Sequence, residues 1–352
     1  MPWYRQIVTG NRQCAASCLL LSALVLLTAA AVQGAPGPGS WTRQTSGTLS
    51  WFHSVFFLDQ NRGWAIGSKG VLLKTADGGE TWRFRPKPGE DNLRDIYFTD
   101  EQNGWLVCER NIYELKTKDE PRSYLMNTKD GGVTWARFDM KDADIDARLM
   151  RAVFTRNGRG WVFGEAGMLF ATRDGGENWT RLQIPTRHLL LGGDFVDNDR
   201  GWLVGAGATI LQTSDGGDTW HLSKLTKAQG VRFNAASFVD NRIGWAVGGA
   251  GRIFHTINGG RTWDEQTTGV AVDLLDVKFL DASEGWAVGA EGIVIHTLDG
   301  GLHWARELTG TTHPLERVFF ADRNHGWAVG FGGTIITYVR GSASGSSARS
   351  NP

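Results

Sequence analysis

The chain has 352 residues, of which 41% are apolar and 21% are charged, and its formal net charge is zero. This length allows one large domain or two small ones, and the zero net charge argues against a strongly electrostatic partner such as duplex DNA. The 47 glycines and 16 tryptophans are typical of short strands joined by tight turns.

The first 35 residues differ in composition from the rest of the chain. Arg5 and Arg12 precede an apolar run over residues 14–32, and small residues follow it before Pro36. We interpret residues 1–35 as a secretory signal peptide. An uncleaved membrane anchor is the alternative, because the run is just long enough to cross a bilayer. Either way we expect an exported body, periplasmic or anchored and facing the periplasm or a lumen.

The cysteines add two expectations. The apolar core lies after Cys18 and does not lead into it, which is not the arrangement of a lipoprotein signal. Cys108 is the only cysteine after residue 35, so we expect no intramolecular disulfide in the mature chain and a small packed side chain at this position.

A Gly-Trp pair recurs through the body of the chain with gaps of 41, 56, 41, 43, 41 and 41 residues. A period of this length indicates a repeat architecture. The seven tryptophans of these pairs are Trp64, Trp105, Trp161, Trp202, Trp245, Trp286 and Trp327.

The seventh Gly-Trp unit lacks the second half of its repeat, and the N-terminus supplies it. Trp41 lies 41 residues before Trp82, and the segment 41–47 resembles 263–269. One repeat therefore takes strands from both chain ends, which closes a ring and leaves no sheet edge exposed. We predict an all-β, seven-bladed β-propeller over residues 36–340, with its last blade closed by the N-terminal strand.

The sixth unit shows why each blade should contain four strands. Residues 275–279 alternate in polarity, 285–289 form a short buried strand, and 292–297 are rich in β-branched residues. A turn at 299–301 then leads to an outer strand that begins at Trp304. We expect little helix anywhere.

A second motif, Thr-x-Asp-Gly-Gly-x-x-Trp, follows the Gly-Trp pair in six units and resembles the Asp-box of bacterial neuraminidase-type repeats. We assign it a structural role, because the carboxylate can accept backbone N–H bonds within the turn while the tryptophan covers it. Carbohydrate or metal binding is the alternative, but six boxes around a ring cannot converge on one ligand. The residues are Asp77, Asp130, Asp174, Asp215, Asp299, Trp82, Trp135, Trp179, Trp220, Trp263 and Trp304.

We predict no enzymatic activity, cofactor or metal site. A sialidase needs an arginine cluster and a tyrosine paired with a glutamate, and no such pair can be assigned by motif. The histidines have no metal-ligand spacing, and the glycines belong to turns rather than to a phosphate-binding loop.

The combination of Gly-Trp-Ala-Val-Gly with the Asp-box over about 300 residues, closed by Trp41, resembles the photosystem II stability/assembly factor-like family. This resemblance implies an exported propeller that binds a protein partner, a membrane-protein assembly intermediate, and assists its assembly. The longer second unit is a departure from the pattern.

A partner site is expected on the face of the ring that carries the connections between second and third strands and between blades. Two connections there are long, 106–129 and 136–150, and long loops on rigid scaffolds often carry function. Arginines also gather near the starts of inner strands, where they can hold carboxylates. A decorated hairpin with solvated charges is the alternative. The candidate partner-binding residues are Arg94, Arg151, Arg317, Arg232, Tyr113 and Tyr124.

The leading hypothesis is therefore a monomeric, non-catalytic scaffold that binds a protein and no nucleic acid. A glycan-binding or glycoside-hydrolase-like propeller is the alternative, and it would need two facing carboxylates among Glu109, Glu114, Asp139 and Asp142. The Ser- and Gly-rich tail 341–352 is expected to be disordered.

Overall fold

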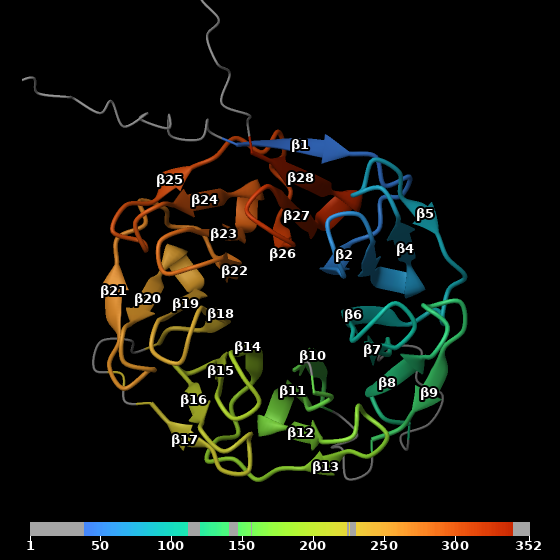
Figure 1. Cartoon of the computed structure of the whole chain (residues 1–352), viewed down its shortest axis with the longest axis horizontal. Helices are drawn as coiled ribbons and strands as arrows, with labels where there is room; N and C mark the ends of the chain where they lie inside the picture. Colours follow the sequence, from blue (N-terminus) through green and yellow to red (C-terminus); the bar gives the residue numbers. More distant parts are fainter. Residues whose placement is uncertain are drawn as a thin grey trace, which may run out of the picture. The chain divides into compact units, whose positions relative to one another are not determined.

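The structure, a computed structural model, describes residues 39–111, 120–140, 147–155, 157–223, 225 and 230–340. In these residues seven four-stranded antiparallel sheets are arranged as blades around a central axis (Figure 1). The predicted seven-bladed propeller is confirmed. The predicted signal peptide 1–35 and tail 341–352 lie outside the described residues. Within the described ranges no helix is long and apolar enough to cross a membrane.

The strands follow the repeat, from the inner to the outer strand of each blade. Blades 1 to 3 consist of β2 (Phe52–Phe57), β3 (Gly63–Gly67), β4 (Leu72–Thr75), β5 (Arg83–Phe84); β6 (Asn92–Phe98), β7 (Gly104–Glu109), β8 (Ser123–Thr128), β9 (Ala136–Phe138); and β10 (Leu149–Phe154), β11 (Gly160–Gly164), β12 (Leu169–Thr172), β13 (Thr180–Arg181). Blades 4 to 6 consist of β14 (Leu190–Phe195), β15 (Gly201–Gly205), β16 (Ile210–Thr213), β17 (His221–Leu222); β18 (Phe233–Phe238), β19 (Gly244–Gly248), β20 (Ile253–Thr256), β21 (Asp264–Gln266); and β22 (Leu274–Phe279), β23 (Gly285–Gly289), β24 (Val294–Thr297), β25 (Ala305–Arg306). Blade 7 consists of β26 (Leu315–Phe320), β27 (His325–Gly330), β28 (Ile335–Val339) and β1 (Ser40–Gln44).

The helical content of the described residues is limited to short 3-10 turns between second and third strands, at η1 (Ser68–Gly70), η2 (Glu165–Gly167), η3 (Gly249–Gly251), η4 (Ala290–Gly292) and η5 (Phe331–Gly333). Gly70 has a φ of +67°, and a Cβ there would lie 1.8 Å from the Gly89 carbonyl oxygen. Glycine is therefore required where this turn meets the connection to the next blade.

Blade 7 is closed as predicted from Trp41. Strand β1 pairs antiparallel with β28 and places Trp41 opposite Tyr338. Figure 1 shows the blue β1 lying along the outside of the red β28. The indole Nε1 of Trp41 also donates a 2.5 Å hydrogen bond to Glu307. Both ends of the described chain therefore meet in one sheet, so the ring has no open strand edge at its seam.

The Gly-Trp tryptophans join each blade to the next. At six of the seven junctions the indole stacks on the phenylalanine that ends the following inner strand, with ring centroids 3.4 to 4.1 Å apart. At the seam, Trp327 stacks on Phe57 and its Nε1 donates to the Gly78 carbonyl. The exception is Trp105, whose ring lies 6.3 Å from that of Phe154. The Gly-Trp tryptophans thus fill the core between successive blades and hold each blade against the next one around the ring.

Candidate functional site

The mouth of the central channel is built by an irregularity common to all seven inner strands. In each, the residue after the first apolar side chain is skipped by the ladder to the second strand, as a β-bulge would do. Bulges redirect side chains, and all seven skipped residues line one cavity of about 270 Å³. We call them the bulge ring: His53, Arg94, Met150, Leu191, Asn234, Leu275 and Glu316.

The bulge ring is chemically divided. Met150, Leu191 and Leu275, from blades 3, 4 and 6, give the mouth an apolar part. The remaining four members are polar or charged, and His53 Nδ1 lies 3.1 Å from Glu316 Oε2. The rest of the lining comes from the neighbouring connections and from the next residues of two inner strands: Arg148, Leu189, Arg232, Arg151 and Arg317.

The residue that follows the bulge-ring member lines a further cavity of the channel in five of the inner strands, and these five include two carboxylates and two guanidiniums. The Nη2 atom of Arg317 lies 2.6 Å from Asp95 Oδ1, and that of Arg151 lies 3.3 Å from Asp276 Oδ1. These pairs join blades 7 and 2 and blades 3 and 6, so the charges cross the channel rather than point out of it.

Both carboxylates are also fixed to a neighbouring blade through the backbone. Asp95 accepts the N–H of Ala152 at 3.0 Å, and Asp276 accepts the N–H of Val318 at 3.0 Å. A carboxylate held by a guanidinium and a backbone N–H can be buried at a much smaller cost than an isolated one. We call Asp95, Arg151, Asp276 and Arg317 the channel quartet.

The pKa values of the two guanidiniums of the quartet are shifted in opposite directions. Burial lowers the pKa of Arg151, and the positive charge of Arg317 lowers it further. Burial also acts to lower the pKa of Arg317, but Asp95 and Asp276 outweigh this effect and raise it. Each guanidinium lies beside a buried carboxylate whose charge it offsets.

The structure places the four predicted partner-binding arginines at or in the channel mouth, but each has a carboxylate partner. Arg151 and Arg317 belong to the quartet, and the partner-binding role predicted for them stays a prediction. Arg94 pairs with the buried Glu109. The side chain of Arg232 is 52% exposed and lies 3.7 Å from Asp273, which makes it the predicted arginine most accessible to a partner.

The two predicted tyrosines do not form an exposed contact. Tyr124 lies within β8 rather than in the long connection before it, because β8 begins at Ser123. It is 5% exposed, and its hydroxyl donates to Asp91 at 2.7 Å, so its predicted place in the long connection is wrong. Tyr113 lies outside the described residues.

A pair of exposed aromatic residues beside the mouth was missed by sequence reasoning. Trp51 precedes β2 and is 40% exposed, and Phe331 in η5 is 46% exposed. Their rings meet edge to face with centroids 5.4 Å apart, and Trp51 lies equally close to His53 of the bulge ring. The signal that could have found Trp51 is its position: it is a tryptophan outside both repeat motifs, directly before an inner strand.

The carboxylates that a glycosidase would need are engaged in ion pairs where they are described. Glu109 is 5% exposed and lies within 4 Å of Arg94, Arg122 and Arg148. Asp139 pairs with Arg137. Glu114 and Asp142 lie outside the described residues.

The Asp-boxes form hydrogen-bonded turns on the face opposite the bulge ring. In blade 3, Thr172 Oγ1 donates to Asp174 Oδ1 at 2.7 Å and accepts the N–H of Gly176 at 2.8 Å. The same Asp174 oxygen accepts the N–H of Asn178 at 2.9 Å. The side chains thus satisfy the backbone of the turn.

The other boxes repeat this arrangement. Asp77, Asp130, Asp215 and Asp299 each accept from a threonine two residues earlier and from a backbone N–H four residues later. Each box tryptophan meets the last phenylalanine of its own inner strand edge to face, with centroids 5.8 to 6.1 Å apart: Trp82, Trp135, Trp179, Trp220, Trp263 and Trp304. In blade 5 the acid is replaced by Asn258, which makes equivalent bonds.

We expect the Asp-boxes to make stability depend on acid pH. The N–H of Asn178, together with its side-chain amide, lowers the pKa of Asp174 to about 2. A folded-state pKa below the unfolded value of about 3.9 gives stability that is present above pH ~4 and lost as pH falls towards 2. Asp174→Asn should flatten this pH dependence, measured by urea unfolding between pH 2 and 7.

Asn258 shows that an amide can build the same turn, so Asp174→Asn should cost no more than about 1 kcal/mol at pH 7, as for a surface capping side chain. Thr172→Val is the matched variant, since it removes a box hydroxyl without removing a titrating group. An unchanged pH profile in Asp174→Asn would contradict this account of the box.

Comparison with known proteins places these features in a family. The family described as "Photosynthesis system II assembly factor YCF48" matches residues 37–119, 86–188, 178–268 and 265–339. A "Photosystem II assembly lipoprotein Ycf48" of Synechococcus sp. (strain CC9902) is 30% identical over 132 residues, which are 36% of this chain and 34% of that protein. The match to this relative therefore spans about a third of its length.

Two solved structures show how widely the fold is shared. The structure titled "YCF48 bound to D1 peptide" aligns with a TM-score of 0.68 and 20% identity over 86% of this chain and 95% of that chain. A GH74 xyloglucanase of Xanthomonas campestris aligns with a TM-score of 0.65 and 13% identity over 84% of this chain and 53% of that chain. At these identities the likeness concerns the fold alone, which serves binding proteins and enzymes alike.

Proposed function

The chain belongs to the photosynthesis system II assembly factor YCF48 family, and from this membership we propose that it is an exported, non-catalytic scaffold that binds a membrane-protein assembly intermediate. The name of the Synechococcus relative, an assembly lipoprotein, supports the role in assembly and the place at a membrane. The structure of a family protein with a D1 peptide supports a peptide segment as the bound element. We retain residues 1–35 as the proposed export signal and 341–352 as a tail.

The observation that carries the proposal is the channel mouth. It combines the half-exposed guanidinium of Arg232 with the apolar bulge-ring residues Met150, Leu191 and Leu275. The Trp51–Phe331 pair adds exposed apolar surface beside His53 of the bulge ring. A peptide with acidic and apolar side chains is the chemical complement of this surface.

The described carboxylates favour a binding role over hydrolysis of a glycan. Glu109 and Asp139, the described candidates for a catalytic pair, are each neutralised by arginine. A general acid needs a raised pKa and a nucleophile needs access to the substrate. We therefore propose no catalytic residue in this chain.

The test is peptide binding by fluorescence anisotropy, with a labelled D1 segment as the probe. Arg232→Glu should weaken binding about tenfold, since it reverses one accessible charge, and should reduce the salt dependence. Trp51→Ala should weaken it by a similar factor through lost apolar contact, since hot spots are often aromatic.

Arg306→Glu is the matched control, because it makes the same charge change in an exposed outer strand, β25, away from the mouth. Binding equal to wild type in both mouth variants, with the fold intact by circular dichroism, would refute the assignment. Loss of binding in Arg306→Glu alone would place the site elsewhere on the ring.

A further inference from the structure

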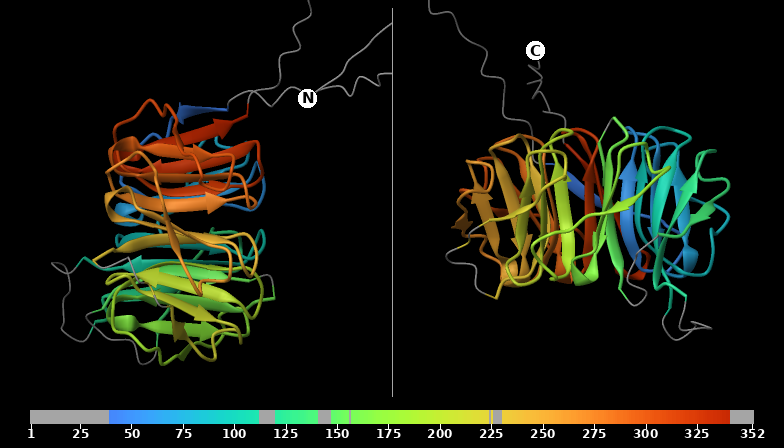
Figure 2. Two further views of the ribbon diagram at one scale, coloured as in Figure 1. Left: turned by 90° about the vertical axis from the view of Figure 1, so that its left-hand side faces the viewer. Right: turned by 90° about the horizontal axis from the view of Figure 1, so that it is seen from below.

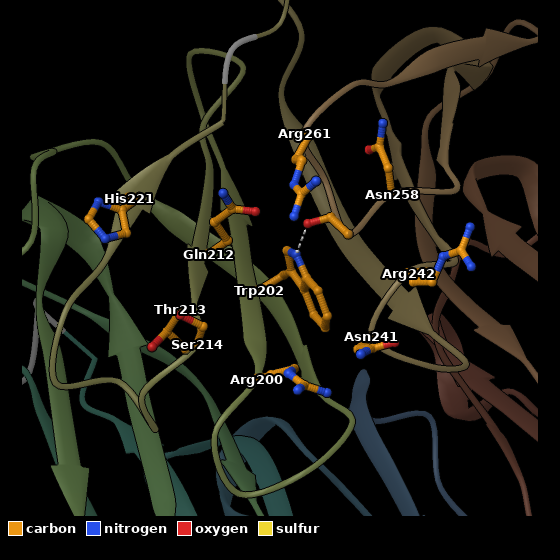
Figure 3. A pocket seen from close by; sticks show the side chains of 11 residues that line it. Arg200, Trp202, Gln212, Thr213, Ser214, His221, Asn241, Arg242, Asn258 and Arg261 are labelled. Atoms are coloured by element: carbon orange, nitrogen blue, oxygen red, sulfur yellow. Dashed lines mark hydrogen bonds between the residues drawn. The ribbon is translucent and has the colours of Figure 1, made fainter.

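A second cavity lies between blades 4 and 5 on the face that carries the Asp-boxes, opposite the bulge ring. It has a volume of about 600 Å³, which is in the range of small-molecule sites. Its lining comes from the connections β14–β15, β18–β19 and β20–β21 and from strands β15 to β17. Figure 3 shows Arg261 above and Arg200 below the indole of Trp202, while the guanidinium of Arg242 points away from it.

The lining of this cavity contains three arginines, one histidine, three side-chain amides and no carboxylate. The amides belong to Gln212, Asn241 and Asn258. These groups supply N–H donors to anionic oxygens, and guanidinium is the group best suited to carboxylate or phosphate.

Two substitutions within the repeat produce this charge. The box of blade 5 has Asn258 where five other boxes have aspartate. It also has Arg261 at the position that is Glu80 in blade 1 and Glu177 in blade 3. The turn itself is preserved, because Thr262 N–H donates to Asn258 Oδ1 at 3.0 Å. The changes therefore alter the charge without being needed for the fold.

The equivalent cavity between blades 2 and 3 provides an internal comparison. It has a volume of about 430 Å³, and its lining includes Asp100, Asp174 and Glu177, with Lys129 as the one basic residue. The same repeat geometry thus presents carboxylates at one junction and guanidiniums at the other. Position in the repeat alone does not explain the arginines.

The acidic side chains near the arginine cavity are largely engaged elsewhere. Asp199 lies 3.7 Å from Arg159, and Asp240 accepts the backbone N–H groups of Arg242 and Ile243. Arg200 lies 3.5 Å from Asp197, in a pair whose side chains are 47% and 44% exposed. Among the described residues, no carboxylate lies within 4.0 Å of the guanidinium of Arg242 or Arg261.

We propose that this cavity binds a small ligand with two or more anionic oxygens, either a polycarboxylate or a phosphate compound. Arg261 provides an uncompensated charge, and Arg200 adds a second that its half-exposed partner Asp197 offsets only in part. The amides of Asn241 and Gln212 provide neutral donors that fix orientation, whereas the amide of Asn258 is engaged by Thr256 and Thr262 within its own turn. A ligand with one charge would meet only part of this donor set. The site lies on the opposite face from the proposed peptide site and does not depend on it.

The experiment is isothermal titration calorimetry of the mature chain with citrate and, separately, with inorganic phosphate, at low and high salt. The decisive variant is Asn258→Asp combined with Arg261→Glu, which gives blade 5 the box acids of blades 1 and 3 and should therefore fold. It should lower the affinity for the better probe at least tenfold, since each lost charged hydrogen bond accounts for about that factor.

The control is Arg83→Glu combined with Thr180→Asp. It makes the net charge more negative by the same amount as the box variant, but in exposed outer strands of other blades. It should leave the affinity within about twofold. A preference for citrate would identify carboxylates as the ligand chemistry, and a preference for phosphate would identify phosphate. Equal affinity of wild type and the box variant, or binding of neither probe to wild type, would overturn the proposal.

Discussion

Asp95→Ala should be among the most destabilising substitutions in this protein, with a loss of about 3–5 kcal/mol in the free energy of unfolding. The change leaves the guanidinium of Arg317 without its 2.6 Å partner and the N–H of Ala152 without its acceptor. Removing one member of a buried ion pair leaves an uncompensated buried charge, which is the costly case. The hydroxyl of Ser54, which donates to Asp95 at 2.7 Å, also loses its acceptor.

The measurement is urea unfolding followed by tryptophan fluorescence, arranged as a double-mutant cycle with Arg317→Met. The double variant should recover much of the loss, because it removes the uncompensated charge along with its partner. Lys129→Ala is the control: this lysine pairs with Glu177, and both side chains are about two-thirds exposed, so its loss should change stability by less than about 1 kcal/mol. A loss below about 1 kcal/mol in Asp95→Ala would mean that the channel quartet does not hold the ring.

Trp41→Ala should have the second large effect, about 3–5 kcal/mol, because it damages the only seam of the ring. The indole is 6% exposed and packs against Phe320 and Tyr338 at centroid distances of 5.9 and 5.3 Å. Large-to-small changes of buried aromatic residues remove transfer energy and leave a cavity. The hydrogen bond from its Nε1 to Glu307 is lost as well.

Deleting residues 36–45 should go further and expose the edge of β28, so the shortened chain should self-associate through that edge. Size-exclusion chromatography with light scattering measures this, and Trp220→Ala in blade 4 is the control for loss of an equally buried indole outside the seam. A circular permutant that places residues 40–47 after residue 340, through an Asp-Gly-Gly box turn, should restore a monomer. A stable monomer from the deletion would contradict the role of β1 in closure.

The local repeat made the blades predictable, because the strand pairs that build blades 1 to 6 lie close together in the chain and recur with the repeat. The Gly-Trp pair places an indole on the next blade at six of seven junctions, and the box places its tryptophan on the same phenylalanine. Trp41 revealed the closure because it continues the spacing of the box tryptophans towards the N-terminus, one repeat of 41 residues before Trp82. Fold class and blade number could therefore be predicted from spacing.

The partners of the channel arginines were beyond such reasoning. Asp95 and Arg317 are 222 residues apart, and Arg151 and Asp276 are 125 apart. All four occupy the same position of the repeat, so the spacing does not tell which of them pair across the ring. Which inner-strand residues face each other depends on the number of blades and on the bulge in every inner strand. Tyr124 illustrates the same limit on a smaller scale, since only the start of β8 at Ser123 decides that its side chain is buried.

The sequence by itself thus determined the repeat, the seven blades and their closure, because these depend on short-range hydrogen bonds and packing that the period repeats. Only the tertiary structure decided which charges neutralise one another in the channel, which remain at its mouth, and where the arginines between blades 4 and 5 gather. Electrostatic pairing acts across the ring between residues that the chain separates, so it follows the closed geometry rather than the order of residues.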